Sequence, residues 1–170
     1  GRIARAIVDD MAKNGGLITL EDLKSYKPIW RDPVCGNFRQ ARVCSMPPPS
    51  SGGIHLLQML NIIGDTDFKS LGWHHPDTIH LLAEAMRIAY ADRSEHLGDP
   101  DFVKVPQQQL INPEYAKLRR QQIDMQRAKP STQVKPVSKQ TLEKFSQNPP
   151  STLIPATSNP KIKKNKYHES

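Results

Sequence analysis

Four carboxylates lie within ten residues near the middle of the chain: Asp92, Glu95, Asp99 and Asp101. Carboxylates at close range can bind Ca²⁺ or serve as an acid–base pair in catalysis. Their spacing does not match the EF-hand loop, however, and Arg93 supplies a counter-ion within the group. We therefore expect salt bridges and helix-end capping here, in preference to a metal site or a catalytic dyad.

Histidines form a second group with potential chemistry, His74, His75 and His80. No further ligand stands at a spacing that would complete a zinc site with them, so surface or capping roles are favoured. The sequence contains no nucleophile elbow, no Cys/His metal pattern and no phosphate loop. From residue types and spacing we assign no catalytic, no substrate-binding and no metal-binding residue.

A proline- and glycine-rich run precedes a predicted helix over residues 54–63: Met46-Pro47-Pro48-Pro49-Ser50-Ser51-Gly52-Gly53. Three prolines favour an extended segment, and Ser50 or Ser51 can cap the helix. The free amides at a helix start can bind an anion, but capping and close packing explain the serines and glycines more simply. The side chains expected on the apolar face of this helix are Leu56, Leu57, Leu60 and Ile63.

Both cysteines fall in a segment, about 33–46, whose alternating pattern predicts a β-hairpin. With a two-residue loop at Arg39-Gln40, Cys35 faces Cys44 in a non-hydrogen-bonded pair. A cross-strand disulfide is then geometrically possible, whereas a longer loop would remove the pairing. We favour two unlinked, buried cysteines, and two cysteines alone do not indicate the redox compartment.

Two short helices are predicted near the start of the chain. The first covers about residues 3–14 and ends at Gly15-Gly16, where glycine accepts a left-handed conformation. The second begins at Thr19, with Asp22 in the capping-box position, and ends before Pro28.

Two further helices are predicted in the second half. The longest covers about residues 76–93, and the last begins at Asn112-Pro113-Glu114 and fades near 129–130. The buried stripe expected on the longest helix consists of Ile79, Leu82, Ala83, Met86, Ala89 and Tyr90.

Positive charge is concentrated at the end of the chain. Of the formal net charge of +7, residues 129–170 contribute +6 through eight Lys and two Glu. This segment is poor in large apolar residues and cannot offset its ordering entropy. We therefore expect 129–170 to be a flexible basic linker. Its lysine run at 161–166 is expected to be solvated, in preference to binding nucleic acid or an acidic membrane.

The fold class expected from these elements is α+β: a helix-rich domain over residues 1–128 with one β-hairpin, followed by the linker. The sequence holds no run of about 18 apolar residues, so we expect no membrane span. It begins in the middle of a helical pattern and without the pattern of a signal peptide, so we expect a piece of a longer protein.

Several segments together resemble the large subunit of γ-glutamyltransferases (γ-glutamyl transpeptidases, glutathione hydrolases). The resemblance rests on residues 14–23, on 46–53, and on Tyr90-Ala91-Asp92-Arg93-Ser94 continuing to Leu97-Gly98-Asp99-Pro100-Asp101-Phe102. It covers about residues 1–130. It implies that the chain is a fragment of the αββα fold of N-terminal-nucleophile hydrolases.

The resemblance also implies a mechanism. One precursor cuts itself into a large and a small subunit, and the new N-terminal Thr of the small subunit is the nucleophile, with its own α-amine as base. The Thr takes the γ-glutamyl group of glutathione into an acyl-enzyme and passes it to water, an amino acid or a peptide, without a cofactor. Oxyanion donors stabilise the tetrahedral intermediate.

By the same resemblance, no catalytic or substrate-binding residue falls within this chain. The nucleophile and the oxyanion glycines belong to the small subunit, and the Arg that holds the substrate carboxylate lies upstream of Gly1. The chain alone should therefore be inactive, with the small subunit as its partner. The family also implies a periplasmic, secreted or cell-surface location.

Two features depart from the family pattern: His96 replaces a usual Tyr, and the lysine-rich stretch 137–166 is longer than usual. Glu169-Ser170 resembles the residues before the self-cleavage point. The alternatives are a non-catalytic truncated relative or an interaction fragment, and an anionic-surface binder ranks below these. Helices built to cover a sheet would leave an apolar face exposed, so we expect the isolated chain to aggregate or pack loosely.

Overall fold

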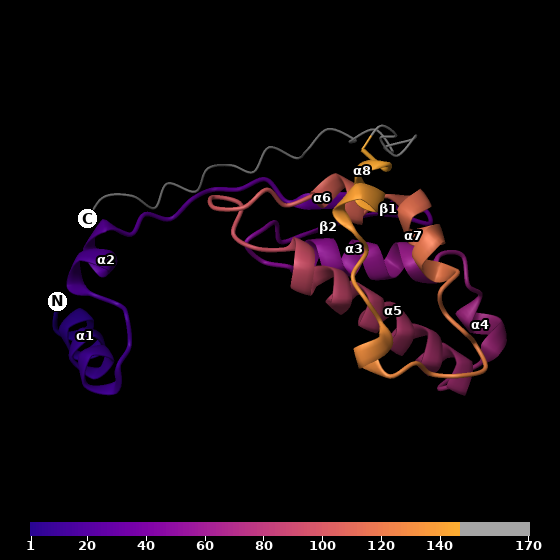
Figure 1. The fold of residues 1–170 in the computed structure, drawn as a ribbon, viewed down its shortest axis with the longest axis horizontal. Coiled ribbons are helices and arrows are strands. Elements are labelled where there is room, and N and C mark those ends of the chain that lie inside the picture. The colour runs from indigo at the N-terminus through magenta and orange to yellow at the C-terminus, as the bar shows by residue number, and fades with distance from the viewer. Residues whose placement is uncertain (147–170) are drawn as a thin grey trace. The chain divides into compact units, whose positions relative to one another are not determined.

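The computed structural model describes residues 1–146 (Figure 1). The chain divides into two compact units, Gly1–Arg31 and a second unit that begins at Asp32, and each is described by itself. No helix of the described residues is long and apolar enough to cross a membrane.

The first unit contains the two predicted helices, α1 (Arg2–Asn14) and α2 (Leu20–Ser25). Gly15 ends α1 in the left-handed conformation, with φ of 73°. Thr19 and Asp22 form the expected capping box, and hydrogen bonds from Thr19 lower the pKa of the Asp22 carboxyl. Neither helix contains a buried residue, and Leu17, Tyr26 and Trp30 are strongly exposed.

The hairpin opens the second unit and has the register expected for the two-residue loop, which was one of the two alternatives. Strands β1 (Val34–Phe38) and β2 (Ala41–Ser45) are antiparallel, and Cys35 lies opposite Cys44. The two cysteines form a disulfide, with their Cα atoms 4.1 Å apart. The preference for unlinked, buried cysteines was therefore wrong, because the two-residue loop brings the pair into the closest cross-strand position and leaves Cys44 exposed.

The proline run turns instead of extending. The Pro48–Pro49 bond is cis, and the amide of Ser50 donates to the carbonyl of Pro47 at 3.1 Å. Helix α3 (Gly52–Ile63) follows, and Ser50 Oγ accepts from the amide of Gly52 at 3.2 Å. A Cβ at Gly53 would overlap the carbonyl oxygen of Met46, so only glycine allows the end of the hairpin to lie this close to α3.

Helices α3 and α5 (Pro76–His96) pack side by side, and the short helix α4 (Phe68–Leu71) connects them (Figure 1). The expected buried faces were partly wrong. Leu57 of α3 is buried, but Leu56 is exposed. On α5, Ala89 of the expected stripe is buried and Ala83 is half-buried. The four large members of the stripe are exposed instead: Ile79, Leu82, Met86 and Tyr90.

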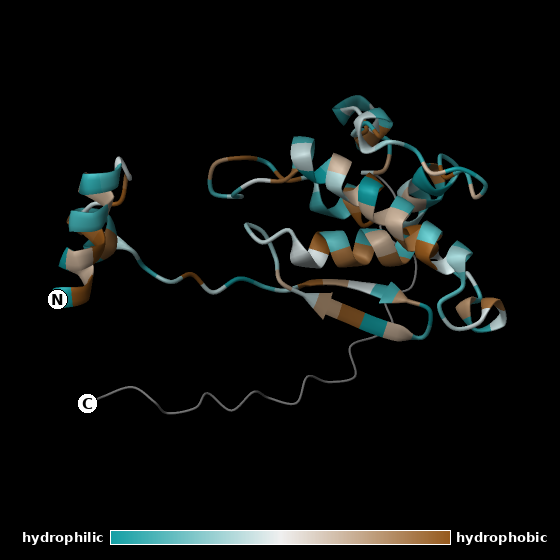
Figure 2. Cartoon of the chain, turned by 90° about the horizontal axis from the view of Figure 1, so that it is seen from below, coloured by the Kyte–Doolittle hydropathy of each residue, from teal (hydrophilic) through white to brown (hydrophobic). Residues whose placement is uncertain are grey.

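The core therefore contacts the other side of α5, through Leu81, Ala85 and Ile88. Figure 2 shows apolar residues distributed along α3 and α5 rather than on one narrow stripe. Because α5 is apolar on more than one side, periodicity did not decide which side faces α3.

Helices α6 (Gln107–Leu110) and α7 (Pro113–Arg120) complete the α3 side of the core. Helix α7 begins where predicted, and Asn112 caps it by accepting from the amide of Glu114 at 2.8 Å. The helix ends at Arg120 rather than near 129. The chain instead turns back along α5, where His80 hydrogen-bonds the carbonyl of Asp124.

Residues 129–146 belong to the fold, which corrects the expected linker boundary at 129. They contain a 3₁₀ helix, η1 (Ser131–Gln133), and helix α8 (Lys139–Glu143), which closes over the core (Figure 1). Leu142 is only 2% exposed, and Val137 and Phe145 pack beside it. The lysine run at 161–166 and Glu169-Ser170 lie outside the described residues.

Candidate functional site

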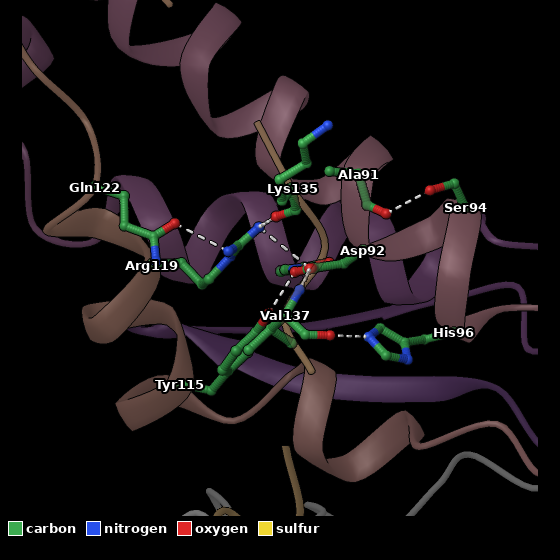
Figure 3. Close-up of polar contacts among 10 residues, drawn as sticks. Ala91, Asp92, Ser94, His96, Tyr115, Arg119, Gln122, Lys135 and Val137 are labelled. Carbon is green, nitrogen blue, oxygen red and sulfur yellow. Dashed lines mark hydrogen bonds and ion pairs between the residues drawn. The ribbon is translucent and has the colours of Figure 1, made fainter. Parts of the chain in front are cut away.

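A fully buried carboxylate, that of Asp92 in the fifth turn of α5, lies at the centre of a cluster of polar side chains. Asp92 is 0% exposed and lies on the side of α5 that faces α3 and α7. Four donors converge on its two oxygens, from Gln58, Tyr115, Arg119 and the backbone amide of Val137. We call Asp92 and these four residues the Asp92 cluster, and Figure 3 shows Asp92 with Tyr115, Arg119 and Val137.

Arg119 of α7 is the counter-ion of Asp92. Its guanidinium lies 3.2 Å from Asp92 Oδ1, and both side chains are almost fully buried. The same guanidinium donates to Gln122 Oε1 at 2.9 Å and to the carbonyl of Lys135 at 3.0 Å. About two turns earlier on α7, Asn112 and Pro113 start the helix and thereby place Arg119 on its inner face.

Tyr115 and Gln58 satisfy the other carboxylate oxygen. Nε2 of Gln58 donates to Asp92 Oδ2 at 2.6 Å, and the hydroxyl of Tyr115 donates to the same oxygen. Burial, followed by the negative charge of Asp92, raises the pKa of Tyr115 far above its ordinary value, so the phenol stays protonated and remains a donor.

The segment before α8 completes the cluster through its backbone. The amide of Val137 donates to Asp92 Oδ1 at 3.0 Å, and the carbonyl of Val137 lies 2.7 Å from His96 Nε2. Upstream, Arg87 pairs with the buried Glu84 and donates to the carbonyl of Lys129 at 2.7 Å. The α5 side chains thus hold residues 129–137 in place.

The Asp92 cluster is arranged for positioning rather than for reaction. Its carboxylate is sealed from solvent, and the groups around it are donors that stabilise the ionised form. A general base needs a path to the proton that it removes, and this carboxylate has none. The cluster therefore joins α3, α5, α7 and residues 135–137 into one unit.

The other predicted groups do not converge on this cluster. Glu95 and Asp101 are exposed, and Asp99 Oδ1 accepts from the backbone amide of Asp101 at 3.0 Å. The counter-ion of Asp92 is Arg119 and not Arg93, which donates to Ser51 Oγ at 3.3 Å instead. Among residues 1–146, no three side chains of the His, Cys, Asp and Glu types lie close enough to hold a metal ion.

The histidine predictions are confirmed in part. His75 caps α5 by accepting from the amide of Asp77 at 3.2 Å, and His74 is exposed and stacks on Trp73. His80 is half-buried and contacts the backbone at Asp124. Two buried histidines were missed, His55 and His96.

Sequence reasoning also missed the partners of Asp92. Gln58 stands within an apolar helix, where one polar residue among leucines and isoleucines was a usable signal of a buried hydrogen bond. Tyr115 stands within the helix predicted to begin at Asn112, but no role was assigned to its hydroxyl. Arg119 gave no such signal, because it is followed by Arg120 and the two look alike in sequence.

Comparisons with known proteins agree on one family. The family model described as Gamma-glutamyltranspeptidase matches residues 1–156, and therefore includes the ordered segment 129–146. The glutathione hydrolase proenzyme of Escherichia coli (strain K12) is 55% identical over 136 residues, which are 80% of this chain and 23% of that protein. The Acylase ACY 1 proenzyme of Pseudomonas sp. (strain SE83) is 49% identical over 129 residues, 76% of this chain and 23% of that protein.

The solved structures agree with the sequence relatives. The crystal structure of Helicobacter pylori gamma-glutamyltranspeptidase matches with a TM-score of 0.70 and 51% identity, over 80% of this chain and 39% of that chain. The chain thus spans about a quarter of the length of the curated relatives that it matches.

Proposed function

Because the chain belongs to the gamma-glutamyltranspeptidase family, we propose that it is part of a proenzyme that hydrolyses glutathione and transfers the γ-glutamyl group to water, amino acids or peptides. The observation that carries the proposal is the 55% identity over 136 residues to a glutathione hydrolase proenzyme. The structural likeness to Helicobacter pylori gamma-glutamyltranspeptidase agrees with it.

The part played by this chain is structural support for the catalytic machinery. Its buried polar group, the Asp92 cluster, is sealed and joins four segments of the fold. The nucleophile is the N-terminal Thr of the small subunit of the same precursor, which forms the γ-glutamyl acyl-enzyme with its α-amine as base. The chain by itself is inactive and acts together with that subunit.

A periplasmic, secreted or cell-surface location belongs to the same proposal. The disulfide between Cys35 and Cys44 supports it, because disulfides persist in oxidising compartments and are rare in the cytosol.

A second candidate is acylase activity on a different acyl amide. The 49% identity to the Acylase ACY 1 proenzyme favours it, since the two kinds of relative are nearly equally similar to this chain. The same fold can support both substrates when the residues that contact the acyl group lie elsewhere in the protein.

A segment exchange tests the proposal. The matching segment of the Escherichia coli glutathione hydrolase proenzyme is replaced by the corresponding 136 residues of this chain. The chimera is expected to cleave itself and to release the chromophore from a γ-glutamyl anilide. A chimera that carries Arg119→Met should fail to mature, whereas one that carries Lys117→Met, an exposed change on the same helix, should behave as the unmodified chimera does.

Two results would contradict the proposal. One is a folded, soluble chimera that neither matures nor turns over the anilide while the Escherichia coli parent does both. The other is turnover of the anilide by the 170-residue chain alone, which would place a nucleophile within it. A matured chimera that hydrolyses only an acylase substrate would favour the second candidate.

A further inference from the structure

The hairpin has one face against α3 and one face directed away from it. Gly36 lies on the inner face, where an added Cβ would be 3.0 Å from Leu57 Cδ2, and Val34 is 1% exposed on the same face. Side chains alternate between the faces of a strand, so Cys35, Cys44 and Arg42 share the outer face. The disulfide is therefore not part of the core.

The two sulfur-bearing residues differ in exposure. Cys44, on β2, is exposed, whereas Cys35, on β1, is half-buried. A thiolate that attacks a disulfide must reach one sulfur in line with the bond. The more exposed end of the disulfide is therefore Cys44, and we take its Sγ as the target.

We propose that Cys44 is a thiolation site, at which small anionic thiols open the Cys35–Cys44 disulfide by exchange. The thiolate of the small molecule bonds to Cys44 Sγ, the Cys35–Cys44 bond breaks, and Cys35 leaves as a thiolate that takes a proton from water. A second thiol attacks the mixed disulfide and completes the two-electron reduction, which yields two free cysteines and one small-molecule disulfide.

Arg42 sets the preference for an anionic thiol. It lies two residues before Cys44 on the same face of β2, and a strand rises by about 3.3 Å per residue, so the two Cα atoms are about 7 Å apart. Its guanidinium stays charged at any ordinary pH, attracts a negatively charged thiol and stabilises the thiolate form of a nearby cysteine. Arg39, the other arginine of the hairpin, points elsewhere and donates to the carbonyl of Thr66 at 2.6 Å.

Opening the disulfide by exchange should loosen the contact between the hairpin and the start of α3. The hairpin ends at Ser45, and the amide of Gly53 donates to the carbonyl of Met46 at 3.0 Å. Loss of the cross-link loosens the strand that this hydrogen bond holds against the helix. The proposal does not depend on γ-glutamyl chemistry, because the reagents and the readout concern this chain alone.

The experiment uses the monomeric fraction of the native 170-residue chain, isolated by size exclusion. It is incubated with reduced glutathione and, separately, with cysteamine, whose thiolate carries no net charge. Free thiols are then alkylated, and the masses of the tryptic peptides are measured by mass spectrometry. Arg39 and Arg42 separate the two cysteines, so the labelled site is unambiguous. We expect one glutathione on Cys44, alkylation of Cys35, and adduct formation at a rate comparable with that of the urea-unfolded chain.

Arg42→Gln tests the charge effect. Removing this unit charge should lower the rate with a doubly charged glutathione thiolate several-fold at low salt, and salt should remove the effect. The variant should therefore lower the ratio of the glutathione rate to the cysteamine rate, whereas Arg39→Gln should leave that ratio nearly unchanged. Adduct on Cys35 instead of Cys44, or adduct in urea only, would overturn the proposal, as would an unchanged ratio in Arg42→Gln.

Discussion

Replacing Arg119 by Met should destabilise the second unit by about 3 kcal/mol. Removing one partner of a buried ion pair costs about 3–5 kcal/mol, because the other charge stays buried without compensation. Asp92 is 0% exposed, so water cannot replace the guanidinium. Three donors remain on the carboxylate, from Gln58, Tyr115 and Val137, and they place the expected loss at the low end of that range.

Urea unfolding followed by circular dichroism measures this loss. For a domain of this size, 3 kcal/mol corresponds to a fall in the midpoint of about 1–3 M urea. Lys117→Met is the matched control, since Lys117 lies on the same helix, is 69% exposed and pairs only with Glu114. Exposed pairs of this kind contribute about 0–1 kcal/mol.

A double variant separates the loss of the pair from the loss of packing. Asp92→Leu with Arg119→Met removes both charges, and it should recover part of the stability that Arg119→Met alone loses. If Arg119→Met costs no more than Lys117→Met, the Asp92 cluster does not hold the fold together and our account of its role is wrong.

Three further predictions concern single residues. Burial, followed by the charge of Arg93, lowers the pKa of His55, so the fold favours the neutral ring. The stability that His55 contributes is then present above about pH 6.5 and is lost as the pH falls toward the pKa of the folded state. His55→Phe should therefore flatten the decline in the free energy of unfolding between about pH 7 and pH 5. An unchanged slope would contradict this. Gly53→Ala should lower the free energy of unfolding in urea by about 1–3 kcal/mol, since the added Cβ meets a backbone carbonyl. Gly52→Ala should lower it clearly less, because the nearest contact of its Cβ is a serine hydroxyl at 3.3 Å. Leu142→Ala should lower the free energy of unfolding by about 2–4 kcal/mol, because the side chain is 2% exposed. A loss below about 0.5 kcal/mol would mean that residues 139–143 are a linker, as the composition had suggested.

Local backbone conformation was predictable wherever one residue type or a short motif determines it. The left-handed Gly15, the capping box at Thr19 and Asp22, and the hairpin register follow from short-range rules. The fold class and the family could also be predicted, because several motifs occur in a fixed order along the chain.

The orientation of α5 could not be predicted in the same way. Its apolar residues occupy more than one side, and the choice between Leu81 and Leu82 as the core residue depends on α3, which periodicity within α5 does not describe. Composition also concealed the role of residues 129–146. Lysines and prolines dominate there, yet Val137, Leu142 and Phe145 suffice to attach the segment to the core.

The manner of this attachment bears on how the sequence can evolve. The α5 and α7 side chains hold the segment from Lys129 to Val137 by its main-chain atoms: the carbonyls of Lys129, Lys135 and Val137 and the amide of Val137. Every amino acid carries the carbonyl, and every one except proline carries the amide. Substitutions at Lys129 and Lys135 other than proline can therefore keep these main-chain hydrogen bonds, whereas the side chain of Val137 also packs against the core. Proline at 137 is the exception, because it alone would remove the donor that Asp92 requires.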